Sequence, residues 1–286
     1  MTARSLAPFD PGVVRPWTLG AGRRGVLLLH GFAGSPPELR RLGEHLAANG
    51  FRCHGPALAG HASTPEALEA TTRQDWTHSA QEELDVLFTE CDEVMVAGQS
   101  MGGTIALHLA ATDLRIAAVA TLAAPVWISG LATRAIPVAR RVMRWHRPGD
   151  DIDLYDLEAI DELYSHGLRP MSAIHEFTGL LKDVRNELAA VRAPVLVLHG
   201  GRDRTIAPAN AAEIEQRLVC SREVVRRSFP RSGHGMSVDV DREAINAAVL
   251  AWFERHSRSA PVAAAPADGG VSRRARRGGG APTRGR

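Results

Sequence analysis

A serine between two glycines is the residue of this chain best placed to do chemistry. The segment Gly98-Gln99-Ser100-Met101-Gly102 follows an apolar run typical of a strand and precedes an alanine-rich run typical of a helix. A serine on so tight a turn adopts strained backbone angles, which requires small residues on either side. The turn raises the hydroxyl above the edge of a sheet, beside the positive end of the following helix. The pattern predicts that Ser100 is a nucleophile.

A serine hydroxyl is a weak nucleophile near neutral pH, so it needs a base, and the base needs an orienting acid. Asp203 follows the apolar run Pro194–Leu198, which lacks polar alternation and is typical of a parallel strand buried on both faces. His234 stands between glycines after a second expected strand at Glu223–Phe229. Both side chains are therefore expected on loops that follow strands. These positions favour Asp203 as the acid and His234 as the base for the serine.

An oxyanion formed during attack on a carbonyl needs two backbone N–H donors. Met101, directly after the serine, is expected to supply the first. The second should come from a loop after an early buried strand, and Gly25–Leu29 leading into His30–Gly34 fits this requirement. Phe32 is the expected donor on that loop.

The motifs together resemble those of the α/β-hydrolase superfamily. They read His-Gly-Phe-x-Gly-Ser-Pro, Gly-His, Gly-x-Ser-x-Gly-Gly, then Asp, then Ser-Gly-His. Within the superfamily the chain looks similar to compact bacterial carboxylesterases and monoacylglycerol lipases, from about Gly25 to Phe253. The resemblance implies the chain order nucleophile, acid, base, with Ser100, Asp203 and His234 in these roles and with Phe32 and Met101 as oxyanion donors. One departure is Gly60-His61-Ala62, where family members often have Gly-His-Gly; it affects a loop near the pocket and leaves the triad intact.

The remaining histidines and acids are weaker candidates for the base and the acid. His30 lies on the oxyanion loop and is expected to fix its geometry by hydrogen bonds. His54 and His61 are expected to hold local structure, and His199 precedes the acid rather than following it. Asp239 and Asp241 are expected to begin the last helix, where carboxylates are favourable.

Strands and helices are expected to alternate along the body of the chain. We expect strands at Gly25–His30, Phe51–His54 and Ile116–Leu122, and helices at Pro36–Asn49, ended by Gly50, and at Thr72–Phe88. Such alternation predicts an α/β fold with a mostly parallel central sheet flanked by helices, and the resemblance specifies the α/β-hydrolase fold.

The strand rhythm stops for about 65 residues between Pro125 and Pro194. Two helical stretches, near Ser129–Trp145 and Met171–Arg192, predict a small helical cap inserted after the strand that ends near Leu122. The expected organisation is a core of residues 1–124 and 191–256, a cap of residues 125–190 and a tail of residues 257–286. Phe32, Trp127 and Ile128 are the expected substrate-binding residues; the alternative is that apolar cap residues pack the cap onto the core.

Composition limits the other possibilities. The 286 residues, 44% of them hydrophobic, favour one domain with a substantial core. Three scattered cysteines suggest inert thiols in a reducing compartment. No run of residues approaches the ~18 apolar residues of a membrane span. The expected location is therefore cytoplasmic. No cofactor is expected: metal-ligand spacing, the P-loop ending and the dinucleotide fingerprint are all missing from the sequence.

The tail changes the charge balance of the chain. Seven arginines and one acid follow Ser257, which leaves 27 basic and 31 acidic residues in the body. The segment from Ala260 to Arg286 is rich in Pro, Gly, Ala and Arg and is expected to be disordered. Contact of its arginines with nucleic acid or anionic lipid is an open alternative; a solvated extension is the favoured interpretation.

These observations predict a serine hydrolase that cleaves carboxylic esters, with short- to medium-chain acyl esters or monoacylglycerols as small-molecule substrates. Two alternatives remain at this point. The same triad could perform another acyl reaction, namely acyl transfer or C–C, thioester or amide hydrolysis, or the fold could serve as a non-catalytic binding protein. Dehalogenase and epoxide hydrolase chemistry is disfavoured because related enzymes of those classes carry Asp in place of Ser100.

Overall fold

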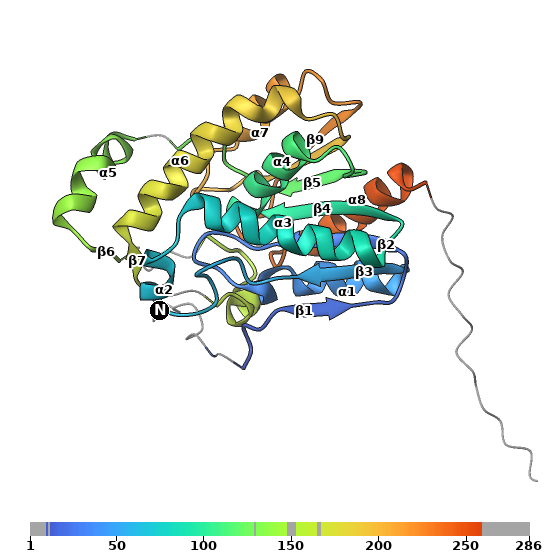
Figure 1. The fold of residues 1–286 in the computed structure, drawn as a ribbon, viewed down its shortest axis with the longest axis horizontal. Helices are drawn as coiled ribbons and strands as arrows, with labels where there is room; N and C mark the ends of the chain where they lie inside the picture. The colour runs from blue at the N-terminus through green and yellow to red at the C-terminus, as the bar shows by residue number, and fades with distance from the viewer. Residues whose placement is uncertain (1–9, 11, 129, 148–152, 165–166, 259–286) are drawn as a thin grey trace, which may run out of the picture.

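The computed structural model describes residues 10, 12–128, 130–147, 153–164 and 167–258. Within them a central sheet of seven strands carries helices on both faces (Figure 1). The strand order is β1-β3-β2-β4-β5-β8-β9, and β1 is antiparallel to β3 while the other neighbours are parallel. The strands are β1 Trp17–Leu19, β2 Arg24–Leu29, β3 Phe51–Gly55, β4 Glu93–Gln99, β5 Val119–Leu122, β8 Val195–Gly200 and β9 Val224–Phe229. The expected α/β class with a mostly parallel sheet is confirmed.

Two hydrophobic cores lie on opposite faces of the sheet. One contains side chains of α1 (Arg40–Ala48) and α8 (Arg242–His256). The other contains side chains from α3 (Arg73–Glu90), α4 (Met101–Thr112), α6 (Met171–Glu187) and α7 (Ala209–Arg217). Successive strand residues point to opposite faces, so Leu27 enters the second core and Leu28 the first. This is why the central strands are continuously apolar in sequence.

The segment between β5 and β8 contains more than two helices. Its elements are α5 Leu131–Val142, β6 Trp145–His146, η2 Leu157–Glu162, β7 Arg169–Pro170, α6 and η3 Leu188–Ala190, with β6 and β7 paired as a small antiparallel sheet. Phe177, Leu181 and Val184 of α6 belong to the same core as α3 and α4. Helix α6 is therefore a layer of the main body, whereas α5 projects at one end (Figure 1).

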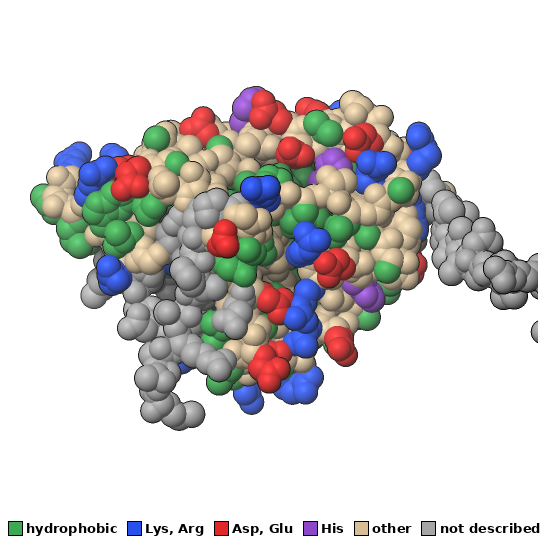
Figure 2. All heavy atoms as spheres, turned by 90° about the horizontal axis from the view of Figure 1, so that it is seen from below, with side chains coloured by type: hydrophobic (Ala, Val, Ile, Leu, Met, Phe, Trp, Pro, Cys, Tyr) green, Lys and Arg blue, Asp and Glu red, His purple; other side chains and the backbone are tan. Residues whose placement is uncertain are grey.

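Helix α5 exposes apolar side chains at its carboxyl end. Val138 is 65%, Val142 82% and Met143 50% exposed. Figure 2 shows green apolar side chains at this end of the molecule, with blue basic side chains beside them. The described side chains of α5 thus belong to neither core. Among the described residues, none of the helices combines the length and apolarity needed to cross a membrane.

Several elements were not expected from the sequence. Strand β1 and helix α2 (Pro65–Glu69) are three and five residues long, too short for a clear periodic pattern. The expected helix at Pro36–Asn49 is divided into a 3-10 turn, η1 (Pro36–Leu39), and α1. Helix α1 ends before Gly50, as expected, and this glycine has a φ of 83°. Cys53 and Cys91 are buried and Cys220 is exposed. From residue 259 onward the predicted tail lies outside the described residues.

The packing of α4 against β2 depends on a glycine and gives a stability prediction. A Cβ at Gly102 would collide with the carbonyl oxygen of Leu29, which is backbone and has little room to move. We expect Gly102→Ala to lower the free energy of unfolding by about 1–3 kcal/mol or more. Gly167→Ala is the matched control, because nothing lies within 4 Å of its Cβ position. Urea denaturation followed by circular dichroism tests this, and equal midpoints for the two variants would contradict it.

Candidate active site

Ser100 lies on the sharp turn between β4 and α4 with φ 53° and ψ −122°. This left-handed backbone conformation is the strain that the flanking glycines led us to expect. The Ser100 N–H donates to the carbonyl of Leu122 at 2.8 Å, so the adjacent strand β5 holds the turn in place. The serine is 8% exposed at the carboxyl edge of the sheet.

Three predicted side chains come together at this edge. His234 Nε2 lies 3.0 Å from Ser100 Oγ, and His234 Nδ1 lies 2.9 Å from Asp203 Oδ2. The Asp203 carboxylate can accept a hydrogen bond but not donate one, so its partner Nδ1 carries the proton. Nε2 then accepts from the serine hydroxyl. The arrangement is the one that lets an imidazole take a proton from a serine.

Asp203 is itself held from several directions. The N–H groups of Thr205 and Ile206 donate to its Oδ1 at 2.9 and 2.7 Å, and His199 Nε2 lies 3.1 Å from its Oδ2. Burial alone would raise the pKa of Asp203. The hydrogen bonds from His199 and His234 outweigh burial and hold this pKa well below its usual value, so the side chain is ionised.

The loop after β2 packs directly against the serine. A Cβ at Gly31 would lie 3.4 Å from Ser100 Cβ. His30 fixes the loop from behind, with Nδ1 2.9 Å from the Gly31 carbonyl and Nε2 accepting from the Leu58 N–H at 3.2 Å. Burial lowers the pKa of His30 to about 4, so it is neutral at physiological pH. The side chain contacts loop backbone and lies outside the serine–imidazole pair.

A second carboxylate links the three loops of the site. Glu38 of η1 accepts from the Gly31 N–H at 2.6 Å and from Gln99 Nε2 at 2.7 Å. Gln99 Oε1 in turn accepts from the N–H of Ser237 at 2.8 Å. Burial raises the pKa of Glu38, and the hydrogen bonds from Gly31 and Gln99 oppose that rise. One chain of hydrogen bonds thus connects the loop after β2, the serine turn and the histidine loop.

Aromatic rings pack together at the loop after β2. Phe32 stacks on Phe177 of α6 with ring centroids 5.2 Å apart, and it contacts Trp76 at 5.8 Å. Trp127 follows β5, and its backbone N–H donates to Oδ1 of buried Asn210 at 3.0 Å. Ile128, the next residue, is 36% exposed. Phe32 and Trp127 are therefore partly buried against the core, whereas Ile128 faces solvent more fully.

Backbone strain is concentrated around the site. In the described part of the chain, four non-glycine residues have positive φ: Ala33, Ala62, Ser100 and Ala123. They lie on the loops that follow β2, β3, β4 and β5. Ala62 stands where the family often has glycine, and its φ of 50° gives the physical reason for that glycine.

Part of the insertion holds the catalytic loops in position. Asp153 Oδ2 accepts from the N–H groups of Arg204 and Thr205 at 2.6 and 3.0 Å, and its carbonyl accepts from His234 N–H at 3.0 Å. Asp153 thus joins the acid loop to the histidine loop. No sequence pattern marked this aspartate.

Asp239 and Asp241 do more than precede the last helix. Asp239 accepts from the N–H groups of Gly233 at 2.7 Å and Tyr155 at 2.8 Å. Asp241 occupies the N-cap position of α8, but its carboxylate makes no capping bond and instead accepts from Ser232 Oγ at 3.1 Å. Asp241 thus stands at the start of the last helix, as expected, and both carboxylates in addition hold the histidine loop.

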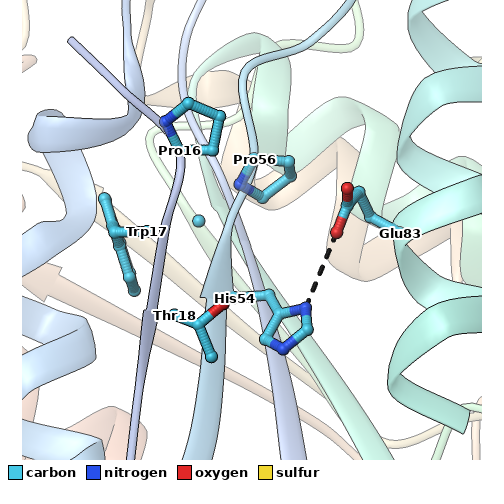
Figure 3. Close-up of a pocket in the computed structure, with 7 residues that line it drawn as sticks. Pro16, Trp17, Thr18, His54, Pro56 and Glu83 are labelled. Carbon is cyan, nitrogen blue, oxygen red and sulfur yellow. Dashed lines mark ion pairs between the residues drawn. The ribbon is translucent and has the colours of Figure 1, made fainter. Parts of the chain in front are cut away.

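A cavity of about 190 Å³ lies apart from these residues (Figure 3). It is lined by Pro16, Trp17, Thr18, His54, Gly55, Pro56 and Glu83, and His54 Nδ1 lies 3.6 Å from a Glu83 carboxylate oxygen. None of these residues belongs to the serine, acid or histidine loops. Across the described residues, no three His, Cys, Asp or Glu side chains are grouped to hold a metal ion.

Comparisons with known proteins agree with the α/β fold. The family model described as serine aminopeptidase, S33, matches residues 20–241. A carboxylesterase of Bacillus subtilis (strain 168) is 27% identical over 245 residues, covering 84% of this chain and 96% of that relative. A thermostable monoacylglycerol lipase of Bacillus sp. (strain H-257) is 29% identical over 243 residues, covering 85% and 95%. A solved structure from work on the metagenome-derived lipolytic enzymes LipS and LipT superposes with a TM-score of 0.80 at 26% identity, covering 85% of this chain and 98% of that one.

The strained alanine gives the first prediction for the site. A residue with a Cβ in the left-handed region destabilises the folded state by roughly 1–2 kcal/mol. Glycine avoids this strain, but part of the gain is lost because glycine also makes the unfolded chain more flexible. We expect Ala62→Gly to raise the free energy of unfolding by up to about 1 kcal/mol. The control is Ala247→Gly in the exposed face of α8, which should lower it by about 0.5–1 kcal/mol. Denaturation curves that shift in the same direction for both variants would count against the strain argument.

The second prediction concerns Glu38. Glu38 accepts hydrogen bonds from Gly31 and Gln99. In Glu38→Gln the side-chain N–H₂ faces one of these two donors, so one hydrogen bond to a charged group is lost and we expect the loop after β2 to shift. A loss of about 1.5–3 kcal/mol corresponds to a roughly 10–100-fold slower reaction of Ser100 with a fluorophosphonate probe. Glu44→Gln, in an exposed pair with Arg40, is the control and should label at the wild-type rate. Equal labelling rates for the two variants would remove Glu38 from the site.

Proposed function

This chain belongs to the serine aminopeptidase S33 family of α/β-hydrolases, and we propose that it hydrolyses carboxylic esters through an acyl-enzyme on Ser100. The observation that carries the proposal is the imidazole of His234, which lies within hydrogen-bond distance of both Ser100 Oγ and Asp203 Oδ2. The similarity to a carboxylesterase and to a monoacylglycerol lipase over most of the chain supports an ester as the substrate.

In the proposed first half-reaction, Ser100 Oγ attacks the ester carbonyl carbon while His234 Nε2 takes the hydroxyl proton. The carbonyl π electrons move to oxygen, and the N–H groups of Phe32 and Met101 donate to the resulting oxyanion. The tetrahedral intermediate then collapses, the ester C–O bond breaks, and His234 gives its proton to the departing alcohol. Asp203 keeps the proton on Nδ1 and stabilises the imidazolium that forms in between.

In the second half-reaction a water molecule replaces the alcohol. His234 accepts a proton from the water as its oxygen attacks the acyl carbon, and the same two N–H groups bind the second oxyanion. Collapse breaks the bond to Ser100 Oγ, which regains its proton from His234, and the carboxylic acid leaves. Each proton taken is returned, so the cycle needs no metal or cofactor.

The surroundings favour an uncharged, apolar acyl group. Phe32 is partly buried beside the expected oxyanion loop, and the buried rings of Phe177 and Trp76 pack behind it. We propose short- to medium-chain acyl esters or monoacylglycerols as substrates, with Phe32, Trp127 and Ile128 contacting them.

The family description is serine aminopeptidase, and an aminopeptidase acts on a peptide with a free amino terminus. Such a substrate carries an ammonium group close to the scissile carbonyl and needs a carboxylate to receive it. Two carboxylates of the site, Asp203 and Glu38, already accept hydrogen bonds from protein donors on both of their oxygens. Their engagement favours an ester over an aminopeptidase substrate.

Substitution of the serine tests the proposal. Wild-type protein should hydrolyse p-nitrophenyl esters of C2 to C12 acids and leave aminoacyl p-nitroanilides uncleaved, whereas Ser100→Ala should lose about 10⁴-fold or more in kcat. The control is Ser221→Ala, since this serine contacts the carbonyls of Ala193 and Glu223 before β9. Equal ester hydrolysis by wild type and Ser100→Ala would refute the assignment. Preferential cleavage of the anilides would replace it with aminopeptidase activity.

A further inference from the structure

We propose that His199 is a positioning residue for the catalytic acid, acting as a neutral hydrogen-bond donor that holds Asp203 Oδ2 toward His234. The inference rests on the proposed function of Ser100 and extends the triad by one side chain. His199 stands at the end of β8, four residues before Asp203, and is 2% exposed. Its Nε2 lies 3.1 Å from Asp203 Oδ2 and 3.1 Å from the carbonyl oxygen of Ile206.

The two neighbours of Nε2 define the protonation of the ring. Nε2 is hydrogen-bonded to the carbonyl oxygen of Ile206, and the carboxylate oxygen of Asp203 lies at the same distance. Both oxygens are acceptors, so Nε2 carries a hydrogen that faces them. The other nitrogen, Nδ1, is buried without a hydrogen-bond partner. A proton on Nδ1 would be a buried N–H donor with no acceptor, a cost that disfavours the charged ring. His199 is therefore a donor and does not take part in proton transfer.

This donor completes the coordination of the acid. Oδ1 of Asp203 receives the N–H groups of Thr205 and Ile206, and Oδ2 receives one imidazole from each side. Without His199, Oδ2 would have His234 alone, and the carboxylate would be less restrained in its plane. One donor fewer would also stabilise the negative charge of Asp203, which would therefore attract the protonated His234 ring more strongly.

The second effect has a signature in the pH dependence. Loss of His199 favours the protonated, inactive form of the base, so the acid limb of the kcat/KM profile moves to higher pH. The other groups facing this region are Glu38 from η1 and Asp153 and Asp239 around the histidine loop. The partners of the His199 ring nitrogen are Asp203 and Ile206 rather than these three carboxylates, so we expect the shift to report on the donor to Asp203.

Two substitutions separate the donor from its packing. Gln places its amide nitrogen the same number of bonds from Cα as Nε2, so His199→Gln keeps the donor. His199→Phe keeps the ring volume and removes the donor. We expect His199→Phe to lower kcat roughly 10–100-fold, the effect of about 1.5–3 kcal/mol for a hydrogen bond to a charged group. KM should stay within a few-fold, and His199→Gln should restore most of kcat and the wild-type acid limb.

The assay measures kcat and KM for p-nitrophenyl butyrate from pH 5 to 9, with thermal denaturation of each variant alongside. Equal impairment of the Gln and Phe variants, in proportion to lost stability and with an unmoved acid limb, would overturn the proposal in favour of packing alone. Wild-type rates for His199→Phe would also overturn it. If the wild type hydrolysed no ester, the proposed function would fail, and the rate of fluorophosphonate labelling of Ser100 against pH would still test His199.

Discussion

The hydrogen bond between His234 Nδ1 and Asp203 Oδ2 is the interaction on which the rest of the site depends. A neutral imidazole can carry its proton on either nitrogen, and a general base at Ser100 needs the lone pair on Nε2. Asp203 selects that tautomer, but only because the carboxylate is itself fixed by backbone N–H groups and by His199. Each hydrogen bond orients the next, from the rigid end of β8 outward to the serine hydroxyl.

The sheet supplies the rigidity that this sequence of bonds requires. The serine, the acid and the histidine follow β4, β8 and β9, which run parallel and end at the same edge. Alternate residues of β4 and β8 enter two separate cores, so these strands are fixed from both faces. A side chain at the end of such a strand has little freedom to shift, which keeps the site preorganised and the free energy of reorganisation during reaction small.

The sequence predicted those features that depend on local pattern. The apolar runs gave the buried strands, and glycines around Ser100 gave the strained turn, because both signals are contained in a few neighbouring residues. The loop-holding roles of Glu38, Asp153 and Asp239 were not predicted, since a carboxylate that accepts backbone N–H groups from distant loops has no signature near its own position. His199 was noticed beside the acid but was considered only as a base. Its contact with Asp203 Oδ2 depends on the course of the loop after β8, which sequence alone does not specify.

The insertion after β5 combines two opposite physical roles. Asp153 joins the acid loop to the histidine loop through hydrogen bonds of its carboxylate and its backbone carbonyl. Helix α6 adds Phe177 to the core, where it stacks on Phe32. Helix α5 instead leaves Val138 and Val142 exposed. The loops that carry strained residues such as Ser100 and Ala33 gain from fixed neighbours, because strain persists only where surrounding contacts over-determine the backbone. The fixed part of the insertion therefore supports both the strained loops and the bond between His234 and Asp203.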